Sequence, residues 1–133
     1  MKSMEENVDI FAEESAPYGG KNLIVEKSID FAVGIIDFCV KISGVNVRVI
    51  LNQLLRSGTS IGANIHESQS AESRQDFIHK MKIAAKEADE TAYWLKICQR
   101  SKTLPDPSPL DKQVIEIQKI LGKIISSAKQ NSK

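Results

Sequence analysis

The sequence predicts an all-α protein, an antiparallel up-down four-helix bundle. Apolar residues recur with a helical period in four separate segments. Three of the prolines, Pro105, Pro107 and Pro109, lie in a single loop, and no proline interrupts a periodic segment. Four helices of about 20 residues joined by short turns bury all four apolar stripes most simply when consecutive helices run in opposite directions.

Length and composition indicate one ordinary globular domain. The chain has 133 residues, 41% of them hydrophobic and 26% charged, which excludes a disordered tail and a disulfide-framed mini-protein. Its 18 basic and 17 acidic residues leave a net charge of +1, so bulk charge alone does not predict a nucleic-acid-binding protein. Both cysteines, Cys39 and Cys98, lie in periodic segments and are predicted to be reduced core residues.

The charge pattern predicts two regions, a flexible acidic leader over residues 1–21 and the bundle over residues 22–133. Residues 1–21 carry two lysines against five acidic residues, a net charge of −3, and Pro17 and the pair Gly19-Gly20 follow the last of these acidic residues. No basic stretch followed by an apolar run opens the chain, and no segment is apolar enough to span a membrane. We therefore expect a cytoplasmic protein.

The first helix is predicted over residues 22–43, with Asn22 as its N-cap. It carries two adjacent apolar stripes, so that apolar residues cover about 220° of its circumference, against the 100° or somewhat more that a surface helix needs. One stripe consists of Ile24, Phe31, Ile35, Phe38 and Ile42. The other consists of Val25, Ile29, Ala32, Ile36 and Cys39, extended by Val33 and Val40.

The second helix is predicted to begin near Val45, after Gly44 as the C-cap of the first. Its stripe is Val47, Ile50, Leu51, Leu54, Leu55, Gly58, Ile61, Gly62 and Ile65. Gly58 and Gly62 lie one turn apart on this stripe, and each costs about 1 kcal/mol of helix propensity relative to alanine. This cost indicates either a close approach of another backbone or a kink.

The third and fourth helices follow a capping signal and the proline loop. Ser73 and Asp76 form a capping-box pattern before a helix that runs to about Arg100. Its apolar series is Phe77, Met81, Ala84, Ala85, Ala88, Ala92, Leu95 and Cys98. The fourth helix shows an unbroken heptad alternation of Leu110, Val114, Ile117, Leu121, Ile124 and Ala128. Leu54, Ile61, Leu95 and Leu121 are predicted to be buried.

The run from Gln53 to Ser68, followed by Asp76-Phe77-Ile78 and Glu87-Ala88-Asp89-Glu90-Thr91, resembles a bacterial four-helix-bundle family encoded in 23S rRNA intervening sequences. The resemblance covers roughly residues 22–130. Residues that match the family pattern are Arg56, Ser57, Ser60, Ile61, Asn64, Ile65 and Glu67. Ser68 stands where the family usually has glycine, which concerns only the turn after the second helix.

The resemblance implies a helical bundle that assembles into ring-like homopentamers. The family is also similar to the accessory protein of diversity-generating retroelements, which binds a reverse transcriptase and nucleic acid. The resemblance thus implies a fold and an assembly rather than an activity.

The matching polar residues are predicted to hold helices or subunits together. Arg56, Ser60, Asn64 and Glu67 are spaced three or four residues apart, on one face beside the apolar stripe, and Ser57 adjoins them. Side chains in this arrangement can form a hydrogen-bonded strip between neighbouring helices or between subunits.

The excess apolar surface of the first helix predicts a homo-oligomer. Its candidate subunit interface is the stripe of Phe31, Ile35, Phe38 and Ile42, although the sequence leaves open which of the two stripes faces the helix's own bundle. A closed ring is expected because head-to-tail contacts that fail to close grow into filaments, and the resemblance implies five subunits. Alternatively, the leader covers the patch within a monomer through Val8, Ile10 and Phe11.

Lysines late in the fourth helix are candidate nucleic-acid contacts. Lys119, Lys123 and Lys129 have no acidic residue among them after Glu116, although cations near a helix C-terminus also complement the helix macrodipole. The chain has one Trp, two Tyr and four Phe, few for a stacking platform. Binding to RNA or DNA is therefore expected to be weak and electrostatic.

The sequence favours a non-enzymatic scaffold. We expect it to bind no cofactor or metal, to have no small-molecule substrate and not to associate with a membrane. It has no phosphate-cradling glycine loop and no nucleophile elbow. The alternative is a small metal-independent helical ribonuclease, because Arg74 and His79 match an Arg-x4-6-His spacing in which they could handle the proton and the developing phosphate charge. Asp76 and His79 also mimic half of a di-iron site, of which the second half is missing.

Overall fold

The computed structural model describes residues 22–131, and in this range it has four α-helices, one short 3-10 helix and no β-strand. The elements are α2 (Leu23–Val40), η2 (Val45–Val47), α3 (Arg48–Ser68), α4 (Arg74–Arg100) and α5 (Leu110–Asn131). The prediction of an all-α fold with four helices is confirmed. The predicted leader, residues 1–21, and the last two residues of the predicted bundle lie outside the described residues.

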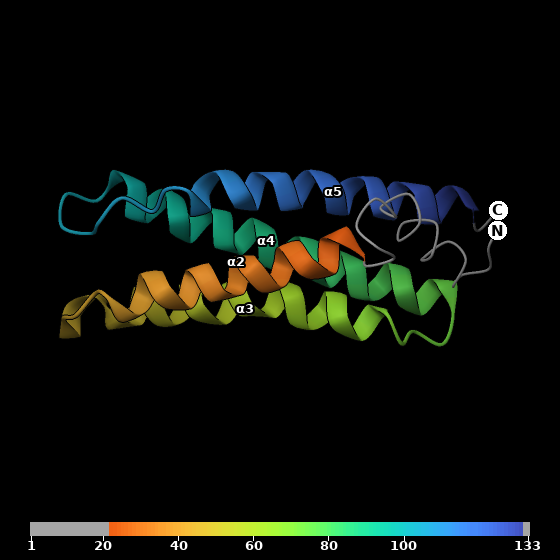
Figure 1. Ribbon diagram of the computed structural model, residues 1–133, viewed down its shortest axis with the longest axis horizontal. Helices are drawn as coiled ribbons and strands as arrows, with labels where there is room; N and C mark the ends of the chain where they lie inside the picture. Colours follow the sequence, from red (N-terminus) through yellow and green to blue (C-terminus); the bar gives the residue numbers. More distant parts are fainter. Residues whose placement is uncertain (1–21, 132–133) are drawn as a thin grey trace.

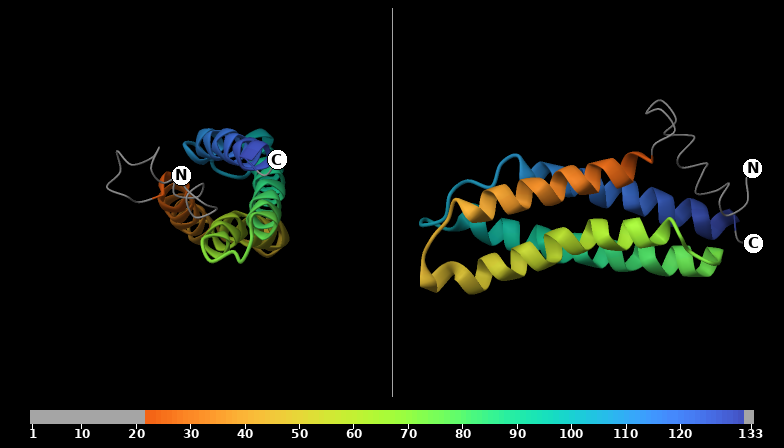
Figure 2. Two further views of the ribbon diagram at one scale, coloured as in Figure 1. Left: turned by 90° about the vertical axis from the view of Figure 1, so that its right-hand side faces the viewer. Right: turned by 60° about the horizontal axis from the view of Figure 1, so that its bottom comes forward.

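Each helix lies beside the one before it, with the connections at alternate ends (Figure 1). The α3–α4 contact is the most extensive, followed by α4–α5 and α2–α3, and the α2–α5 contact is less extensive than these three. An ion pair between Lys27 Nζ and Glu116 Oε1, 3.0 Å apart, ties α2 to α5. Viewed end-on, the helices surround a common centre (Figure 2).

Helix α2 starts where the sequence predicts, but the connection between α2 and α3 is longer than predicted. Asn22 is the N-cap of α2, since its side chain accepts a hydrogen bond from the backbone N of Ile24 at 3.2 Å. The helix ends at Val40 rather than Ser43, and α3 begins at Arg48 rather than Val45. Gly44 adopts a φ of +137°, a conformation that favours glycine, and the short η2 follows it.

The turn between α3 and α4 forms without the usual family glycine. Ser68 is buried, and its Oγ donates to the carbonyl O of Ile65 at 2.6 Å. Ser73 caps α4 by accepting from the backbone N of Asp76 at 3.0 Å. The Asp76 carboxylate accepts from the backbone N of Glu72 at 3.3 Å, one residue before the usual capping-box donor.

The core is formed by the predicted stripes of all four helices. Leu54, Ile61, Leu95 and Leu121 are at most 1% exposed, as predicted. All six heptad residues of α5 are buried. The thiols of Cys39 and Cys98 are free and buried, and burial raises the pKa of Cys39 to about 11, with a further contribution from Cys98. Burial also raises the pKa of Cys98.

Gly58 and Gly62 mark a close approach of α2 to α3. A Cβ on Gly58 would lie 3.0 Å from Ile35 Cγ1, and one on Gly62 would lie 3.2 Å from Ser28 Oγ. Helix α3 continues without interruption through both positions. Of the two explanations for these glycines, the close approach is confirmed.

This approach decides which apolar stripe of α2 faces the bundle. Phe31 and Ile35 are 1% and 0% exposed, and Phe38 and Ile42 are half-buried against the core. The assignment of Phe31 and Ile35 to a subunit interface is therefore wrong, because the chain's own helices cover both residues. Of the second stripe, Ile29, Val33, Ile36 and Val40 remain at the surface, exposed by 49%, 50%, 41% and 72%, whereas Cys39 is buried and Val25 and Ala32 are half-buried. None of the helices in residues 22–131 is long and apolar enough to cross a membrane.

Candidate functional site

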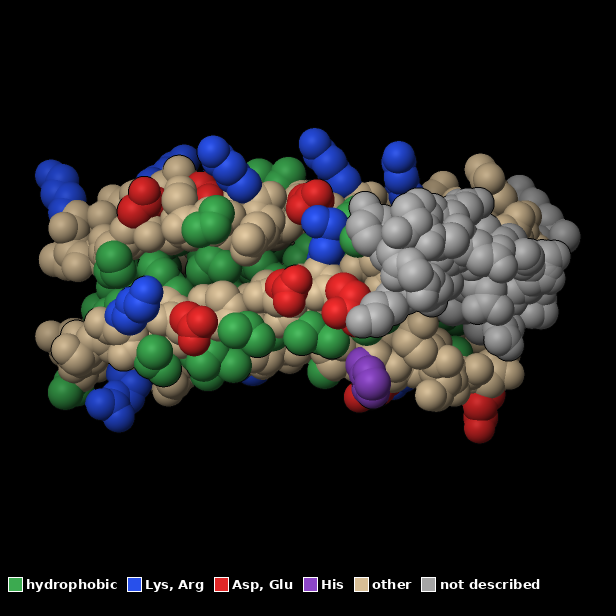
Figure 3. All heavy atoms as spheres, viewed as in Figure 1, with side chains coloured by type: hydrophobic (Ala, Val, Ile, Leu, Met, Phe, Trp, Pro, Cys, Tyr) green, Lys and Arg blue, Asp and Glu red, His purple; other side chains and the backbone are tan. Residues whose placement is uncertain are grey.

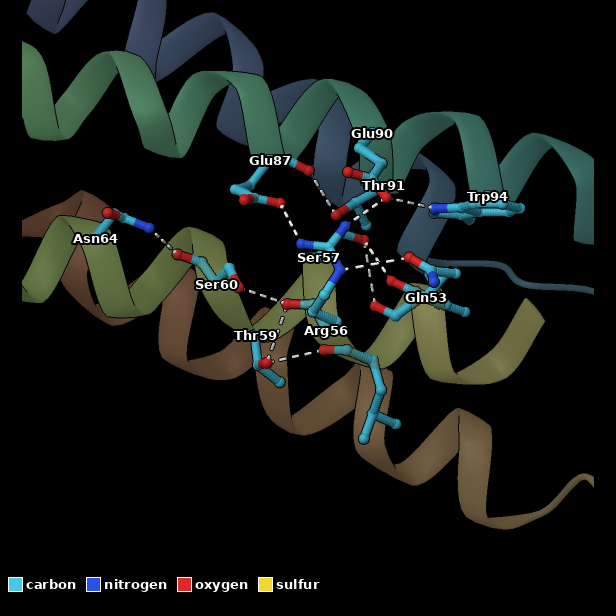
Figure 4. A network of polar contacts seen from close by, with 12 residues as sticks. Gln53, Arg56, Ser57, Thr59, Ser60, Asn64, Glu87, Glu90, Thr91 and Trp94 are labelled. Atoms are coloured by element: carbon cyan, nitrogen blue, oxygen red, sulfur yellow. Dashed lines mark hydrogen bonds and ion pairs between the residues drawn. The ribbon is translucent and has the colours of Figure 1, made fainter. Parts of the chain in front are cut away.

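A polar network joins the middle of α3 to α4 (Figure 4). The Arg56 guanidinium donates through Nη1 to Glu87 Oε1 at 3.2 Å and through Nη2 to Glu90 Oε2. Trp94 Nε1 donates to the same Glu90 oxygen at 3.0 Å. The hydrogen bond with Glu90 is the main cause that raises the pKa of Arg56, and the hydrogen bonds from Arg56 and then Trp94 lower the pKa of Glu90.

This network joins α3 to α4 but contributes little to stability. The Arg56 side chain is 47% exposed, so water and salt screen its two ion pairs. The guanidinium fork nevertheless bridges two carboxylates one turn apart on α4, so it links the two helices at two points.

Ser57 and Thr91 are fully buried hydroxyls on these two helices, and both are satisfied within their own helix. Ser57 Oγ donates to the carbonyl O of Gln53 at 2.9 Å, and Thr91 Oγ1 donates to that of Glu87 at 2.7 Å. Such bonds leave a compact side chain at the helix contact with its hydroxyl satisfied.

The predicted strip of Arg56, Ser60, Asn64 and Glu67 bridges helices through its two ends. Glu67 Oε1 accepts from Lys80 Nζ of α4 at 2.9 Å, and this bond is the main cause that raises the pKa of Lys80. Ser60 Oγ and Asn64 Nδ2 donate instead to carbonyl oxygens of α3, at 2.6 and 2.9 Å. The strip therefore joins α3 to α4 of one chain through Arg56 and Glu67.

Sequence reasoning missed the partners of this strip, Lys80, Glu87, Glu90 and Trp94. Two of them, Glu87 and Glu90, lie in the third family-like run, Glu87-Ala88-Asp89-Glu90-Thr91, which was the available signal. The sequence pattern of one helix does not predict which residues of another helix lie opposite it.

The candidate nucleic-acid contacts Lys119, Lys123 and Lys129 are all exposed on α5. Only Lys129 lies in the last turn, where the macrodipole acts, so the macrodipole explanation does not extend to Lys119 and Lys123. Helix α4 brings Lys82 next to Lys129, since close contact between the two amines lowers the pKa of Lys82. The cationic surface thus reaches across from α5 to α4.

Arg74 and His79 do not share one side of α4. Residues five apart on a helix are separated by about 140° around its axis. Arg74 Nη1 donates to the carbonyl O of Ala128 near the end of α5 at 3.5 Å, and His79 is exposed. Within residues 22–131, no group of three His, Cys, Asp or Glu residues is arranged to hold a metal ion.

Two open hollows flank the first half of α5. One, of about 460 Å³, lies between α2 and α5 and is lined by Asp30, Asp37, Phe38 and Leu110 among others. The other, of about 470 Å³, lies between α4 and α5 and is lined by residues that include Ala92, Lys96, Lys112 and Ile115. Each hollow combines apolar and charged side chains.

Comparisons with known proteins agree with these observations. No curated protein matches the chain. A crystal structure of a protein of unknown function from the S23 ribosomal protein family of Bacteroides thetaiotaomicron VPI-5482 is 43% identical in sequence, with a TM-score of 0.70. The match covers 77% of this chain and 97% of that one. Residues 20–123 match the family described as 23S rRNA-intervening sequence protein, and the chain therefore belongs to this family.

Proposed function

We propose that the chain is a non-enzymatic cytoplasmic scaffold, an antiparallel up-down bundle that assembles into a closed homo-oligomeric ring, with five subunits favoured, and presents lysines to RNA. The observation that carries this proposal is the exposed apolar stripe of α2, Ile29, Val33, Ile36 and Val40. The number of subunits rests on what the family resemblance implies.

The stripe is a continuous surface feature rather than scattered apolar residues. Its four members follow a spacing of four, three and four residues, so they line one side of α2. Figure 3 shows green side chains in a row along α2 and across its border with α3. Soluble monomers rarely expose a contiguous apolar patch of this kind, and a second copy would cover it. A head-to-tail contact that closes on itself gives a ring instead of a filament.

Light scattering tests the assembly. We expect both the full chain and a version that begins at residue 21 to have masses several times that of one copy, which is 14.7 kDa for the full chain, because the stripe lies in α2. A soluble monomer of the shortened version at micromolar concentration would refute the ring. A monomer only when residues 1–20 are present would show instead that the leader covers the stripe.

RNA is the proposed nucleic acid because the family description and the name of the similar crystal structure both refer to ribosomal components. The surface proposed to contact it is formed by Lys119, Lys123 and Lys129, with Lys82 beside Lys129. Adjacent ammonium groups repel one another, and a phosphate between them relieves that repulsion.

We expect RNA binding to weaken about 20-fold between 50 and 200 mM salt, as three phosphate contacts to a single strand predict. Changing Lys119, Lys123 and Lys129 to Gln should remove most of the binding in a fluorescence anisotropy titration. The matched control changes Lys41, Arg48 and Lys102 to Gln, which removes the same charge from positions elsewhere on the bundle and should preserve binding. Binding that is insensitive to salt, or that survives the first triple change, would contradict the proposed RNA surface.

The scaffold proposal also predicts that labelled RNA stays full length when incubated with the purified protein and EDTA. Arg74 and His79 lie on different sides of α4, and this separation supports the expectation. Degradation that disappears in His79→Ala would contradict the scaffold and favour the metal-independent ribonuclease. Degradation that persists in His79→Ala would indicate a contaminating nuclease.

A further inference from the structure

Two carboxylates accompany the exposed stripe of α2. Asp30 and Asp37 lie seven residues apart, so they share one side of the helix, next to Val33. Both are exposed, and neither takes part in an ion pair among residues 22–131. Figure 3 shows red side chains along α2 beside the green row. We call this surface of Ile29, Val33, Ile36, Val40, Asp30 and Asp37 the α2 face.

A second apolar surface with the opposite charge lies between α4 and α5. Ile115 is 49% exposed and lines a hollow of about 470 Å³ there, and Tyr93, which is 58% exposed, lies on α4 three residues before Lys96. Lys96 and Lys112 line the hollow, and no ion pair within the described part of the chain uses either of them. We call the surface of Tyr93, Lys96, Lys112 and Ile115 the α4–α5 face.

The acidic residue of this second hollow does not cancel its charge. Asp111 Oδ1 accepts from the backbone N of Lys112 at 2.9 Å and from Ser108 Oγ at 3.4 Å. The Asp111 carboxylate therefore stabilises the first turn of α5, where a negative charge complements the helix dipole. The two lysines remain available to a partner.

We propose that, in the oligomer of the preceding subsection on which this inference rests, the α2 face of one copy docks on the α4–α5 face of the next. Each face offers apolar side chains for burial, and the carboxylates of one meet the ammonium groups of the other. The contact is heterologous, because it joins two different surfaces of the same chain. An antiparallel pairing of two α2 faces would instead bring Asp30 and Asp37 against the same carboxylates of the second copy.

The two faces lie at the same level along the bundle. Asp30 and Asp37 line one hollow together with Leu110 and Gln113, and Lys112 and Ile115 line the hollow on the other side of α5. Neighbouring copies can therefore stand side by side without sliding along the bundle axis. A closed ring needs contacts without an axial shift, because the last copy must contact the first at the same level along the ring axis. The lysines assigned to RNA lie further along α5 and stay uncovered.

The test disables each face separately in the full chain. One variant carries Val33→Arg and Ile36→Arg, and the other carries Tyr93→Arg and Ile115→Arg. All four residues are exposed by at least 41%, so folding should be retained and is checked by circular dichroism. A matched control carries Val45→Arg and Val49→Arg, which are 80% and 68% exposed and belong to neither face.

We expect each face variant to be a monomer in light scattering, the control to assemble like the natural chain, and an equimolar mixture of the two face variants to stop at a dimer. The mixture stops because it contains one intact α2 face and one intact α4–α5 face per pair. Assembly of the Tyr93→Arg, Ile115→Arg variant by itself, or no association in the mixture, would overturn the inference. Loss of assembly in the control would overturn it too.

A charge exchange tests the electrostatic part. Asp30→Lys with Asp37→Lys should abolish assembly, and adding Lys96→Glu with Lys112→Glu in the same chain should restore it. Failure of the restoration in a folded chain would contradict the pairing of these charges. A monomeric natural chain would refute the ring itself. This result differs from the outcomes that refute the pairing of the two faces, because those are seen only when the natural chain assembles.

Discussion

Replacing Leu121 with alanine should lower the free energy of unfolding by about 2 to 5 kcal/mol. Leu121 is 0% exposed and lies mid-way along the buried stripe of α5. The substitution removes buried methyl groups and leaves a cavity that the packed neighbours fill only in part. Equilibrium unfolding in urea, followed by circular dichroism at a fixed protein concentration, measures the change.

The control for Leu121 is Val49→Ala in α3, where the side chain is 68% exposed. It should change stability by less than about 0.5 kcal/mol, the range of neutral surface substitutions. Fixed concentration matters because assembly adds to apparent stability. A change below about 0.5 kcal/mol for Leu121→Ala would contradict the assignment of the α5 heptad to the core.

Replacing Gly58 with leucine should destabilise the fold by about 1 to 3 kcal/mol or more, the cost of overpacking a core. A Cβ at this position would already lie 3.0 and 3.1 Å from the two γ-carbons of Ile35, which is itself fully buried. A longer side chain must push α2 away from α3. Thermal and urea unfolding would both show the loss.

Two further variants separate overpacking from helix propensity. Gly122 lies in α5, where no packing neighbour among residues 22–131 comes within 4 Å of the position that a Cβ would take, so Gly122→Ala should stabilise by about 1 kcal/mol through propensity alone. Combining Gly58→Leu with Ile35→Ala should cost less than the sum of the two single changes, because the second makes room for the first. Additive losses would show that Gly58 and Ile35 do not meet.

The elements that the sequence predicts best are those with one stripe and clear ends. Helix α4 ends at Arg100, and every heptad residue of α5 is buried, as the pattern predicts. Helix α3 begins at Arg48 instead of Val45 because Gly44 takes a positive φ and a 3-10 turn precedes the helix. Periodicity does not distinguish that tight turn from the first turn of an α-helix.

The orientation of α2 could not be predicted because its two stripes are both apolar. Burial of Ile35 rather than Ile36 follows from a contact with another helix, at Gly58, where the missing side chain leaves room. The same limit applies to the polar site. The sequence identified Arg56 and Glu67 among five candidate residues, but their partners Glu90 and Lys80 depend on the register between α3 and α4.

The two buried thiols allow local opening of the bundle to be measured by chemical labelling. With a pKa of about 11, only about one Cys39 side chain in 10,000 is a thiolate at pH 7, and the thiolate is the form that attacks a disulfide reagent. Modification of Cys39 is therefore slow in the packed bundle and becomes faster when the surrounding helices separate and hydrate the thiol. In a Cys98→Ser variant, which leaves Cys39 as the thiol on α2, the rate of labelling consequently measures how often the helices around Cys39 separate.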